Sequence, residues 1–424
     1  MPGRLLAENV LLATELDQGY KRSNISPRAM LKVDLRKAFD SVRWDFVIAT
    51  LNVMGLPQRY VNWISECITT ASFTICVNGE SGVYFKSRRG LRQGDPLSPY
   101  LFVLAMEVFS RLLKSRYESG YIRYHPNAEP IDISHLMFAD DVMVFYDGSN
   151  SSLHGISETL DDFSSWSGLE INQSKSELFT AGLDQLETNT SMNYGFLMGS
   201  LPICYLGLPL MHRKLRVSEY SILLDKISGT FKAWSARHLS FAGRLVLIKF
   251  VISGIIVFWI TTFILPKGCI KKIESLCYKY LWSGQIEGPA FTKVSWAACC
   301  VPKREGGLGL SRFETWNKTL CLRLIWLLYA EGGSLWVAWH KYHHLRNSSF
   351  WSLTEHTQDS WHRKSMLNLR PLARPFIICT VQNGNMASFW LDHWTPLGPL
   401  LDTLGVNRPR ALRIPLHATV LEAT

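Results

Sequence analysis

The sequence has little charge and lacks the cysteine spacings of disulfide-rich or small zinc-binding proteins. Of its 424 residues only 19% are charged, whereas 47% are hydrophobic and 12% are aromatic. This composition excludes a wholly disordered chain. The nine cysteines include no CxxC pair, which indicates free thiols in a reducing compartment. The protein is therefore expected inside the cell, in the nucleus or cytoplasm.

A signal peptide and a full-length transmembrane run are also not apparent. The first sixteen residues contain acidic side chains and no uninterrupted apolar stretch. The longest apolar run, 250–265, is shorter than the ~20 residues of a spanning helix and is followed by Pro266. A buried core helix is the prediction for this run, and no membrane partner is expected. A membrane protein anchored by 250–265 is the weakest alternative.

Charge is unevenly distributed between the two halves of the chain. The net charge is −4 over 1–185 and +14 over 186–424. Such an asymmetry predicts a polyanionic partner held mainly by the second half. A generally basic surface explains the same numbers equally well, and both interpretations stay open at this point.

The length favours two or three domains, and the sequence pattern divides the chain into the ranges 1–185, 186–290 and 291–424. Within the second range, residues 216–282 are predicted to be mainly helical and are basic. Residues 334–424 are rich in Trp and His and have weak periodicity. This last stretch is expected to form a loosely ordered tail.

Strand-like and helical patterns alternate in the first range, which predicts an α+β fold. Residues 30–35 alternate apolar and polar side chains, as a half-buried strand does, and 98–120 have the pattern of a long amphipathic helix. One hairpin is predicted over 72–90, turning at Glu80 and Ser81. A second is predicted over 131–147, with Asp140 and Asp141 between its strands.

Acidic residues in strand-like surroundings are the first sign of chemistry. Asp140 and Asp141 stand side by side in an apolar hairpin, and like charges so placed need solvent or a cation. Taken alone, the pair fits an ordinary Asp-rich turn better. Asp34, within the strand predicted over 30–35, is a third carboxylate. If the strand and hairpin are neighbours, the three carboxylates suit hard divalent cations.

The run 88–102, RRGLRQGDPLSPYLF, supplies basic and flexible residues. Gly94 permits close backbone approach to a ligand, and the arginines suit phosphates. A basic loop that caps the following helix is the simpler interpretation of this run by itself.

Four segments in this order resemble the palm motifs of reverse transcriptases, most closely those of plant LINE-type non-LTR retrotransposons. They are KVDLRKAFDSVRW (32–44), the run 88–102, FADD (138–141) and GLEINQSKSELF (168–179). The resemblance implies a palm, which is a small antiparallel sheet with packed helices, followed by a helical thumb. Residues 296–310 and 389–394 resemble the start of the zinc-binding region that follows such polymerases.

The resemblance also implies a reaction and its metal ligands. The reaction is RNA-directed DNA synthesis, in which a primer 3′-OH attacks a deoxynucleoside triphosphate (dNTP). Asp34, Asp140 and Asp141 would hold two Mg²⁺ ions, with Mn²⁺ as the substitute. The implied partners are an RNA template, a DNA primer and dNTP. No obligate protein partner is indicated.

Five further residues receive roles from the resemblance. Phe39 would lie beneath the incoming sugar and disfavour a 2′-OH, although a core aromatic is the simpler interpretation. Arg92, Gln93 and Gly94 would line the nucleotide and template pocket. Lys175 would lie near the triphosphate and protonate the pyrophosphate, and a solvated loop lysine is nearly as good an interpretation.

Two departures from the family pattern limit the expected activity. The family's basic finger region precedes an element that is seen here as Gly3-Arg4 to Asn9, so most of the fingers are expected to be missing. Little or no polymerase activity of these residues alone is therefore expected, and an inactive nucleic-acid-binding remnant is the alternative function. At the other end, His340, His343 and His344 do not combine with cysteines at zinc spacing.

Overall fold

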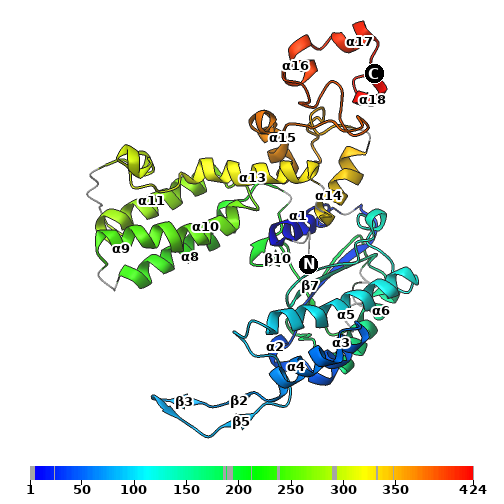
Figure 1. Cartoon of the computed structure of the whole chain (residues 1–424), viewed down its shortest axis with the longest axis vertical. Coiled ribbons are helices and arrows are strands. Elements are labelled where there is room, and N and C mark those ends of the chain that lie inside the picture. Colours follow the sequence, from blue (N-terminus) through cyan, green and yellow to red (C-terminus); the bar gives the residue numbers. More distant parts are fainter. Residues whose placement is uncertain are drawn as a thin grey trace. The chain divides into compact units, whose positions relative to one another are not determined.

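The computed structural model describes residues 5–22, 24–184, 188, 194–211, 213–235, 239–288, 294–330, 333–346 and 348–423 (Figure 1). Its contacts divide the chain into two compact units. The sheet unit is Gly19–Leu206, and the helical unit is Met1–Gln18 together with Gly207–Thr424. This grouping differs from the three predicted ranges, which stay a prediction. The predicted α+β fold is confirmed.

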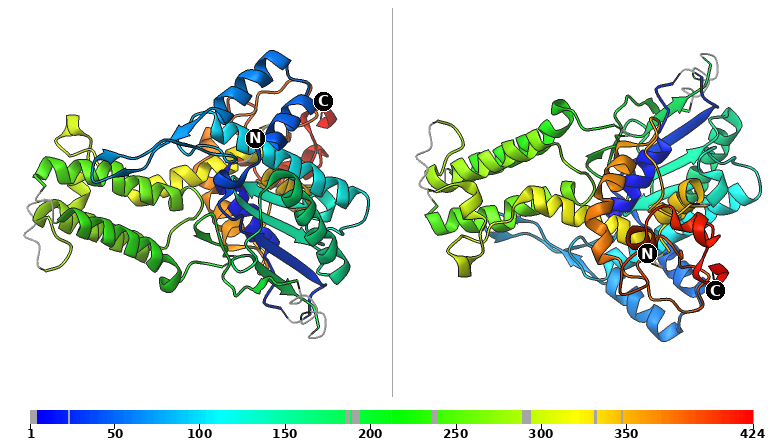
Figure 2. Two further views of the ribbon diagram at one scale, coloured as in Figure 1. Left: turned by 90° about the horizontal axis from the view of Figure 1, so that it is seen from below. Right: turned by 90° about the horizontal axis from the view of Figure 1, so that it is seen from above.

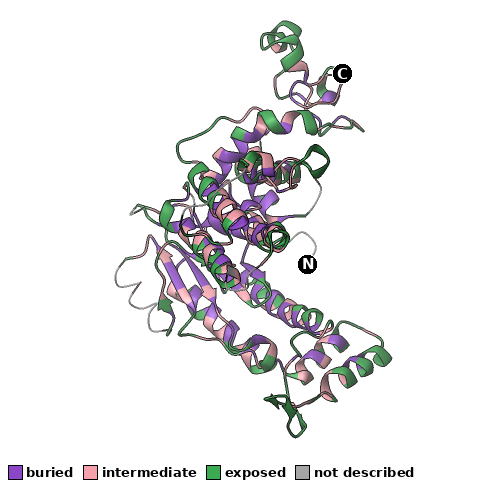
Figure 3. Cartoon of the chain, turned by 90° about the vertical axis from the view of Figure 1, so that its left-hand side faces the viewer, coloured by how far each residue is buried: buried purple, intermediate pink, exposed green. Residues whose placement is uncertain are grey.

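A five-stranded sheet forms the centre of the sheet unit, in the order β6-β7-β1-β8-β9. Its bounds are β1 Arg28–Val33, β6 His135–Phe138, β7 Asp141–Tyr146, β8 Glu177–Ala181 and β9 Leu197–Met198. The central strand β1 pairs antiparallel with β7 and β8, whereas β8 and β9 run parallel. Five of the six residues of β1 are buried, which explains its apolar sequence and the purple colour of the strands in Figure 3.

Helices cover the sheet and close its core. They are α2 Ala38–Ser41, α3 Trp44–Val53, α4 Gln58–Thr69, α5 Ser98–Glu118, η1 Glu129–Ile131 and α6 Asn150–Ser167. The long helix α5 confirms the prediction over 98–120. Its Phe109 packs on Phe163 of α6 with ring centroids 4.9 Å apart. The hydroxyl of Tyr117 donates to the carbonyl of Phe145 at 2.8 Å, which joins α5 to β7.

The predicted hairpin over 72–90 exists, but its turn lies elsewhere. Its strands are β2 Ser72–Phe73, β3 Cys76–Val77, β4 Glu80–Ser81 and β5 Phe85–Lys86. The turn consists of Asn78 and Gly79, both with positive φ (52° and 88°), as a two-residue type I′ turn requires. The prediction of a turn at Glu80-Ser81 was therefore wrong, because the Asn-Gly pair is the stronger turn signal.

The helical unit contains α1 Leu6–Leu16 from the N-terminal segment. After residue 207 it continues with α8 Val217–Ser235, α9 Phe241–Val246, the π-helical turn η2 Leu247–Ile252, α10 Ser253–Ile260 and α11 Lys267–Ser283. The helical prediction for 216–282 is confirmed. Helices α8, α10 and α11 pack together with α13 Phe313–Tyr329, and Figure 2 shows the long helices side by side. Along the chain, strand β10 Cys204–Tyr205 is the last element of the sheet unit, and strand β11 Leu208–Pro209 follows in the helical unit.

The apolar run 250–265 is helical only as far as Ile260, and the helix begins before the run, at Phe241. Residues Phe241–Ile260 form a continuous 20-residue helical stretch. The expectation that this segment is shorter than the ~20 residues of a membrane-spanning helix was therefore wrong. Its most apolar window has a mean hydropathy of 2.1 and is 28% buried. Phe250 is 66% exposed, whereas Ile256 is fully buried. The expected core helix is thus buried on one side only. By length and composition the stretch is able to cross a membrane, as some core helices of soluble proteins also are.

The described residues of the C-terminal stretch, 334–346 and 348–423, form helices around buried side chains, which corrects the expectation of a loose tail over 334–424. Its elements are α14 Leu335–His340, the π-helical turn η4 Lys341–Leu345, α15 Trp361–Ala373, η5 Arg374–Phe376, α16 Leu400–Leu404, α17 Arg408–Leu412 and α18 Val420–Ala423. The short helices α12 Trp296–Cys299 and η3 Lys303–Glu305 come before this stretch. Trp336 and Trp390 are almost fully buried. Large aromatic side chains therefore supply the core that weak periodicity conceals.

Buried histidines are expected to make the helical unit sensitive to acid. Burial lowers the pKa of His362 to about 4, and the pKa of His344 is also lowered to about 4, from 6.5. As the pH falls below 6.5, the unfolded chain binds protons that the folded chain does not bind. Each such histidine should therefore reduce the free energy of unfolding by about 1.4 kcal/mol per pH unit between the two pKa values.

This expectation is testable by urea unfolding of the full chain at pH 7 and pH 5. His362→Phe should retain more of its stability at pH 5 than the wild type does. The exposed His356 is the matched control, and His356→Gln should keep the wild-type pH dependence. Equal pH dependence of all three proteins would contradict the role of the buried imidazole.

Candidate active site

Strand pairing brings two of the predicted carboxylates together. Val33 at the end of β1 is paired with Val142 of β7, so Asp34, the next residue, comes opposite Asp141. Asp140 precedes Asp141 in the turn between β6 and β7. Asp34 and Asp141 are half-buried, whereas Asp140 is exposed. The three residues thus meet at one end of the central strand pair, although about a hundred residues separate them in sequence.

The turn that carries Asp140 is shifted by one residue from the predicted position. Phe138 pairs with Asp141, so the two turn residues are Ala139 and Asp140, and the prediction of Asp140 and Asp141 was wrong in this detail. Ala139 has φ of 54°. A positive φ at the first turn residue alone fits a type II′ turn, which favours glycine at that position. An alanine there is strained, as residues at functional sites often are.

Replacing Ala139 by glycine should relieve this strain. Glycine adopts positive φ without steric cost, so Ala139→Gly is expected to raise the free energy of unfolding by about 0.5–1 kcal/mol. Ala49, exposed in helix α3, is the matched control. Ala49→Gly should lower stability by about 0.5–1 kcal/mol. Equal destabilisation by both substitutions in urea melts would show that Ala139 is not strained.

The carboxylates influence each other through their charges. Burial raises the pKa of Asp141, the neighbouring charges of Asp140 and Asp34 raise it further, and Lys32 opposes them. Lys32 is shared with Glu177, whose carboxylate lies 3.5 Å away. An excess of negative charge at this point is what a bound cation would neutralise.

The three carboxylates suit a divalent cation, but their side chains do not form a complete coordination shell. Oxygen ligands from three carboxylates fit Mg²⁺ or Mn²⁺. In the part of the chain that the structure describes, no three His, Cys, Asp or Glu side chains come close enough to hold one ion together. The residues present therefore fit the metals by their chemistry and by their common location.

A loop from the fourth motif supports Asp34. The backbone N–H of Asp34 donates to Oγ of Ser176 at 3.0 Å, and the N–H of Asn172 donates to the Asp34 carbonyl at 2.8 Å. Lys175 belongs to the same loop and is exposed. None of the ion pairs between described residues involves Lys175. The Lys175 ammonium group is thus not held by an ion pair among the described residues. Ser176 is a supporting residue that was not predicted, although its motif was recognised.

Phe39, in α2, packs against helix α5. Its ring is stacked on that of Phe102, with centroids 4.6 Å apart. Its carbonyl accepts the N–H of Leu91 at 2.7 Å, which ties α2 to the start of the second motif. Phe39 is half-buried. The ring therefore serves as a core contact on one side and leaves part of its surface accessible.

The second motif forms an exposed turn before α5. Gln93 and Gly94 are exposed, and Gly94 has φ of 88°. The guanidinium of Arg92 is paired with the carboxylate of Asp95, so it is not a free phosphate ligand in this structure. A Cβ atom at Gly90 would lie 2.7 Å from the carbonyl oxygen of Asp40, which is too close for a residue other than glycine. Gly3 and Arg4, from which the finger element was recognised, lie outside the described residues.

Residues 2–210 match the family model described as reverse transcriptase (RNA-dependent DNA polymerase). A putative ribonuclease H protein of Arabidopsis thaliana is 30% identical over 206 residues, which are 48% of this chain and 33% of that protein. The Pol polyprotein from a type-1 retrotransposable element R2 of Nasonia vitripennis is 25% identical over 96% of this chain and 40% of that protein. The chain thus spans two fifths or less of these relatives.

A solved structure of telomerase from Candida tropicalis, in complex with a fragment of telomeric RNA, is also similar to this chain. It is 12% identical and is matched over 61% of this chain and 42% of that chain, with a TM-score of 0.34.

Proposed function

Because residues 2–210 form a reverse transcriptase domain related to those of non-LTR retrotransposons, we propose that the chain carries out RNA-directed DNA synthesis. The observation that carries the proposal is the neighbourhood of Asp34, Asp140 and Asp141 at one end of the β1–β7 pair. A LINE-type element of plants is the proposed source, on the motifs 32–44, 88–102, 138–141 and 168–179.

The proposed reaction is attack of a primer 3′-OH on the α-phosphorus of a dNTP, with release of pyrophosphate. Asp34, Asp140 and Asp141 would hold two Mg²⁺ ions, or Mn²⁺ in their place. When bound, such ions lower the pKa of the attacking hydroxyl and stabilise the leaving group. The positive charge of the ions would balance the negative charges of Asp140 and Asp34, which raise the pKa of Asp141.

The other residues would position the substrates. Phe39 would present the accessible part of its ring to the sugar, with the stack on Phe102 fixing its orientation. Gln93 and Gly94 would contact the nucleotide and template from their exposed turn, and Arg92 would do so after exchanging Asp95 for a phosphate. Lys175 Nζ would transfer a proton to the pyrophosphate. The loop that joins Lys175 to Asp34 supports this common placement.

A nucleic-acid-binding protein without catalytic activity is the second candidate. The net charge of +14 over 186–424 favours it, because basic side chains bind the phosphate backbone without requiring intact chemistry. In this case RNA and DNA would be bound, but no nucleotide would be incorporated.

Primer extension distinguishes the two candidates. The full chain is incubated with an RNA template, a labelled DNA primer, Mg²⁺ and the four dNTPs, and binding of the same template–primer is measured in parallel. We expect slow extension at most, because most of the fingers are expected to be missing, and the products that form should follow the template sequence and require the divalent metal. Tight binding without any extension in Mg²⁺ or Mn²⁺ would overturn the polymerase proposal and support the second candidate.

A further inference from the structure

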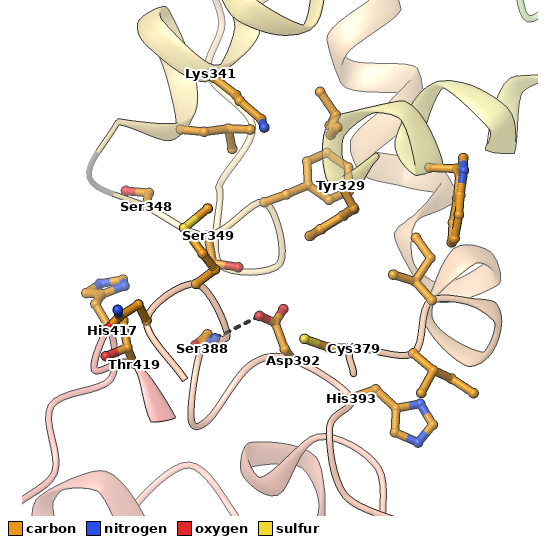
Figure 4. Close-up of a pocket in the computed structure, with 18 of the residues that line it drawn as sticks. Tyr329, Lys341, Ser348, Ser349, Cys379, Ser388, Asp392, His393, His417 and Thr419 are labelled. Atoms are coloured by element: carbon orange, nitrogen blue, oxygen red, sulfur yellow. Dashed lines mark hydrogen bonds between the residues drawn. The ribbon is translucent and has the colours of Figure 1, made fainter. Parts of the chain in front are cut away.

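A cavity of about 720 Å³ lies in the C-terminal part of the helical unit (Figure 4). Its walls come from α13, η4 and the segments 348–350, 377–393 and 417–419. Cavities of 300–1,000 Å³ are typical of small-molecule and cofactor sites. The cavity includes Asp392 and His393 of the segment 389–394, but the proposed polymerase chemistry does not use it.

Asp392 supplies the cavity with a half-buried carboxylate. Its Oδ1 accepts the indole N–H of Trp351 at 3.1 Å, and its Oδ2 accepts the N–H of Ser388 at 2.8 Å. Burial raises its pKa, and these two hydrogen bonds lower it. Asp392 forms none of the ion pairs found between described residues, and Figure 4 shows the carboxylate directed into the cavity. Each oxygen therefore retains acceptor capacity for a ligand.

Aromatic rings and cationic groups complete the walls. Tyr329 lines the cavity and is held by stacking on Trp351, with centroids 5.7 Å apart and an angle of 20° between the rings. Trp326 also lines it and is 52% exposed. Lys341 and Arg346 are exposed on the same rim. Among the described residues that line the cavity, Asp392 is the only acid.

These three features match one kind of ligand. A carboxylate with free acceptor capacity on both oxygens pairs best with two adjacent N–H donors. Guanine presents such a pair, N1–H and N2–H, whereas adenine, cytosine and uracil do not. Flat aromatic surfaces stack on bases, and a cationic rim attracts phosphate.

We propose that this cavity binds one guanine nucleotide, with Asp392 accepting the N1–H and N2–H of the base. Tyr329 provides the stacking surface, and Lys341 and Arg346 hold the phosphate. The nucleotide is either free or an unstacked member of a single strand, since the base and phosphate are the same in both. This site goes beyond the proposed polymerase function and does not depend on it.

Equilibrium binding to the full chain tests the proposal, with GMP, IMP and AMP as probes and without divalent metal, primer or template. IMP keeps N1–H but lacks the 2-amino group. Loss of a hydrogen bond to a charged acceptor should weaken binding about 10-fold or more. The expected order is therefore GMP, then IMP, then AMP. Equal binding of GMP and AMP, or no binding of GMP, would overturn the proposal.

Two variants separate the base contact from the phosphate contact. Asp392→Asn should remove the preference for GMP over AMP. Lys341→Ala, at an exposed position, should weaken all three nucleotides and leave their order unchanged. Asp402→Asn is the control, because that carboxylate is paired with Arg374 and does not line the cavity. A preserved GMP preference in a folded Asp392→Asn protein would contradict the proposed contact.

Single-stranded oligoadenylate with and without one central guanosine distinguishes the two sources. Tighter binding of the guanosine-containing strand than of GMP identifies a strand nucleotide, and equal binding identifies a free nucleotide. Lack of any guanosine effect in either form would refute the site. Because these measurements need neither Mg²⁺ nor catalysis, failure here leaves the primer-extension result unaffected, and the reverse also holds.

Discussion

Asp141→Asn is expected to lower the rate of primer extension about 10³-fold, because loss of a carboxylate ligand removes several kcal/mol of metal-borne transition-state stabilisation. Asp34→Asn should have an effect of similar size, since Asp34 comes opposite Asp141 in the register of β1 and β7. The substitution keeps the shape of the side chain and removes its charge. Single-turnover extension at saturating dNTP measures the change.

The control for this prediction is Asp40→Asn. Asp40 is exposed in α2, only six residues from Asp34, and has no proposed contact with substrate. Its variant should extend primers at the wild-type rate. Template–primer affinity should be retained in all three variants, because the thumb-like basic region is unchanged. Extension by the Asp141→Asn protein at the wild-type rate would contradict the assignment of Asp141 as a metal ligand.

The second large effect concerns salt. If the basic second half holds the nucleic-acid backbone, lysine and arginine displace condensed counterions, and affinity falls with salt concentration. For six to ten phosphate contacts, affinity should fall about 10³-fold to 10⁵-fold between roughly 50 and 200 mM salt. Filter binding of the full chain to template–primer over this range measures the slope.

Charge-neutralising variants locate the contacts that produce this slope. Lys271 and Lys272 are exposed on helix α11 of the helical unit, and Lys271→Gln with Lys272→Gln should reduce the slope of log affinity against log salt by about 2. Arg111 on α5 of the sheet unit is 80% exposed at its side chain. Arg111→Gln should leave the slope unchanged. A binding constant independent of salt would contradict a phosphate-based grip.

Local patterns in the sequence were sufficient to predict the central parts of the fold. Alternation over 30–35 located the strand that becomes β1, but β1 spans Arg28–Val33 and five of its six residues are buried, so the predicted half-burial and bounds were wrong. The strand lies between β7 and β8, so both of its edges are covered as well. The helix α5 is predictable from its amphipathic repeat and the Ser98-Pro99 start. The meeting of Asp34 with Asp141 is not predictable from these patterns. It depends on which strands become neighbours, and only the family motifs suggested that pairing.

The remaining errors have physical reasons of their own. The turns at Asn78-Gly79 and Ala139-Asp140 depend on one-residue differences in register. The helix over Phe241–Ile260 continues through a π-helical turn, where the hydroxyl of Ser253 donates to the Ile248 carbonyl at 3.0 Å. The cavity around Asp392 depends on Trp351, 41 residues earlier in the chain. Contacts between such distant residues leave no periodic signal in the sequence.

The most direct test of the proposed two-metal site is a Mn²⁺ titration followed by electron paramagnetic resonance, with template–primer and a non-hydrolysable dNTP present. The wild-type chain should bind two Mn²⁺ ions more than the protein with Asp34→Asn and Asp141→Asn does. The Asp40→Asn control should bind as the wild type does. Identical Mn²⁺ binding by the wild type and the double variant would contradict the assignment of these carboxylates as the metal ligands.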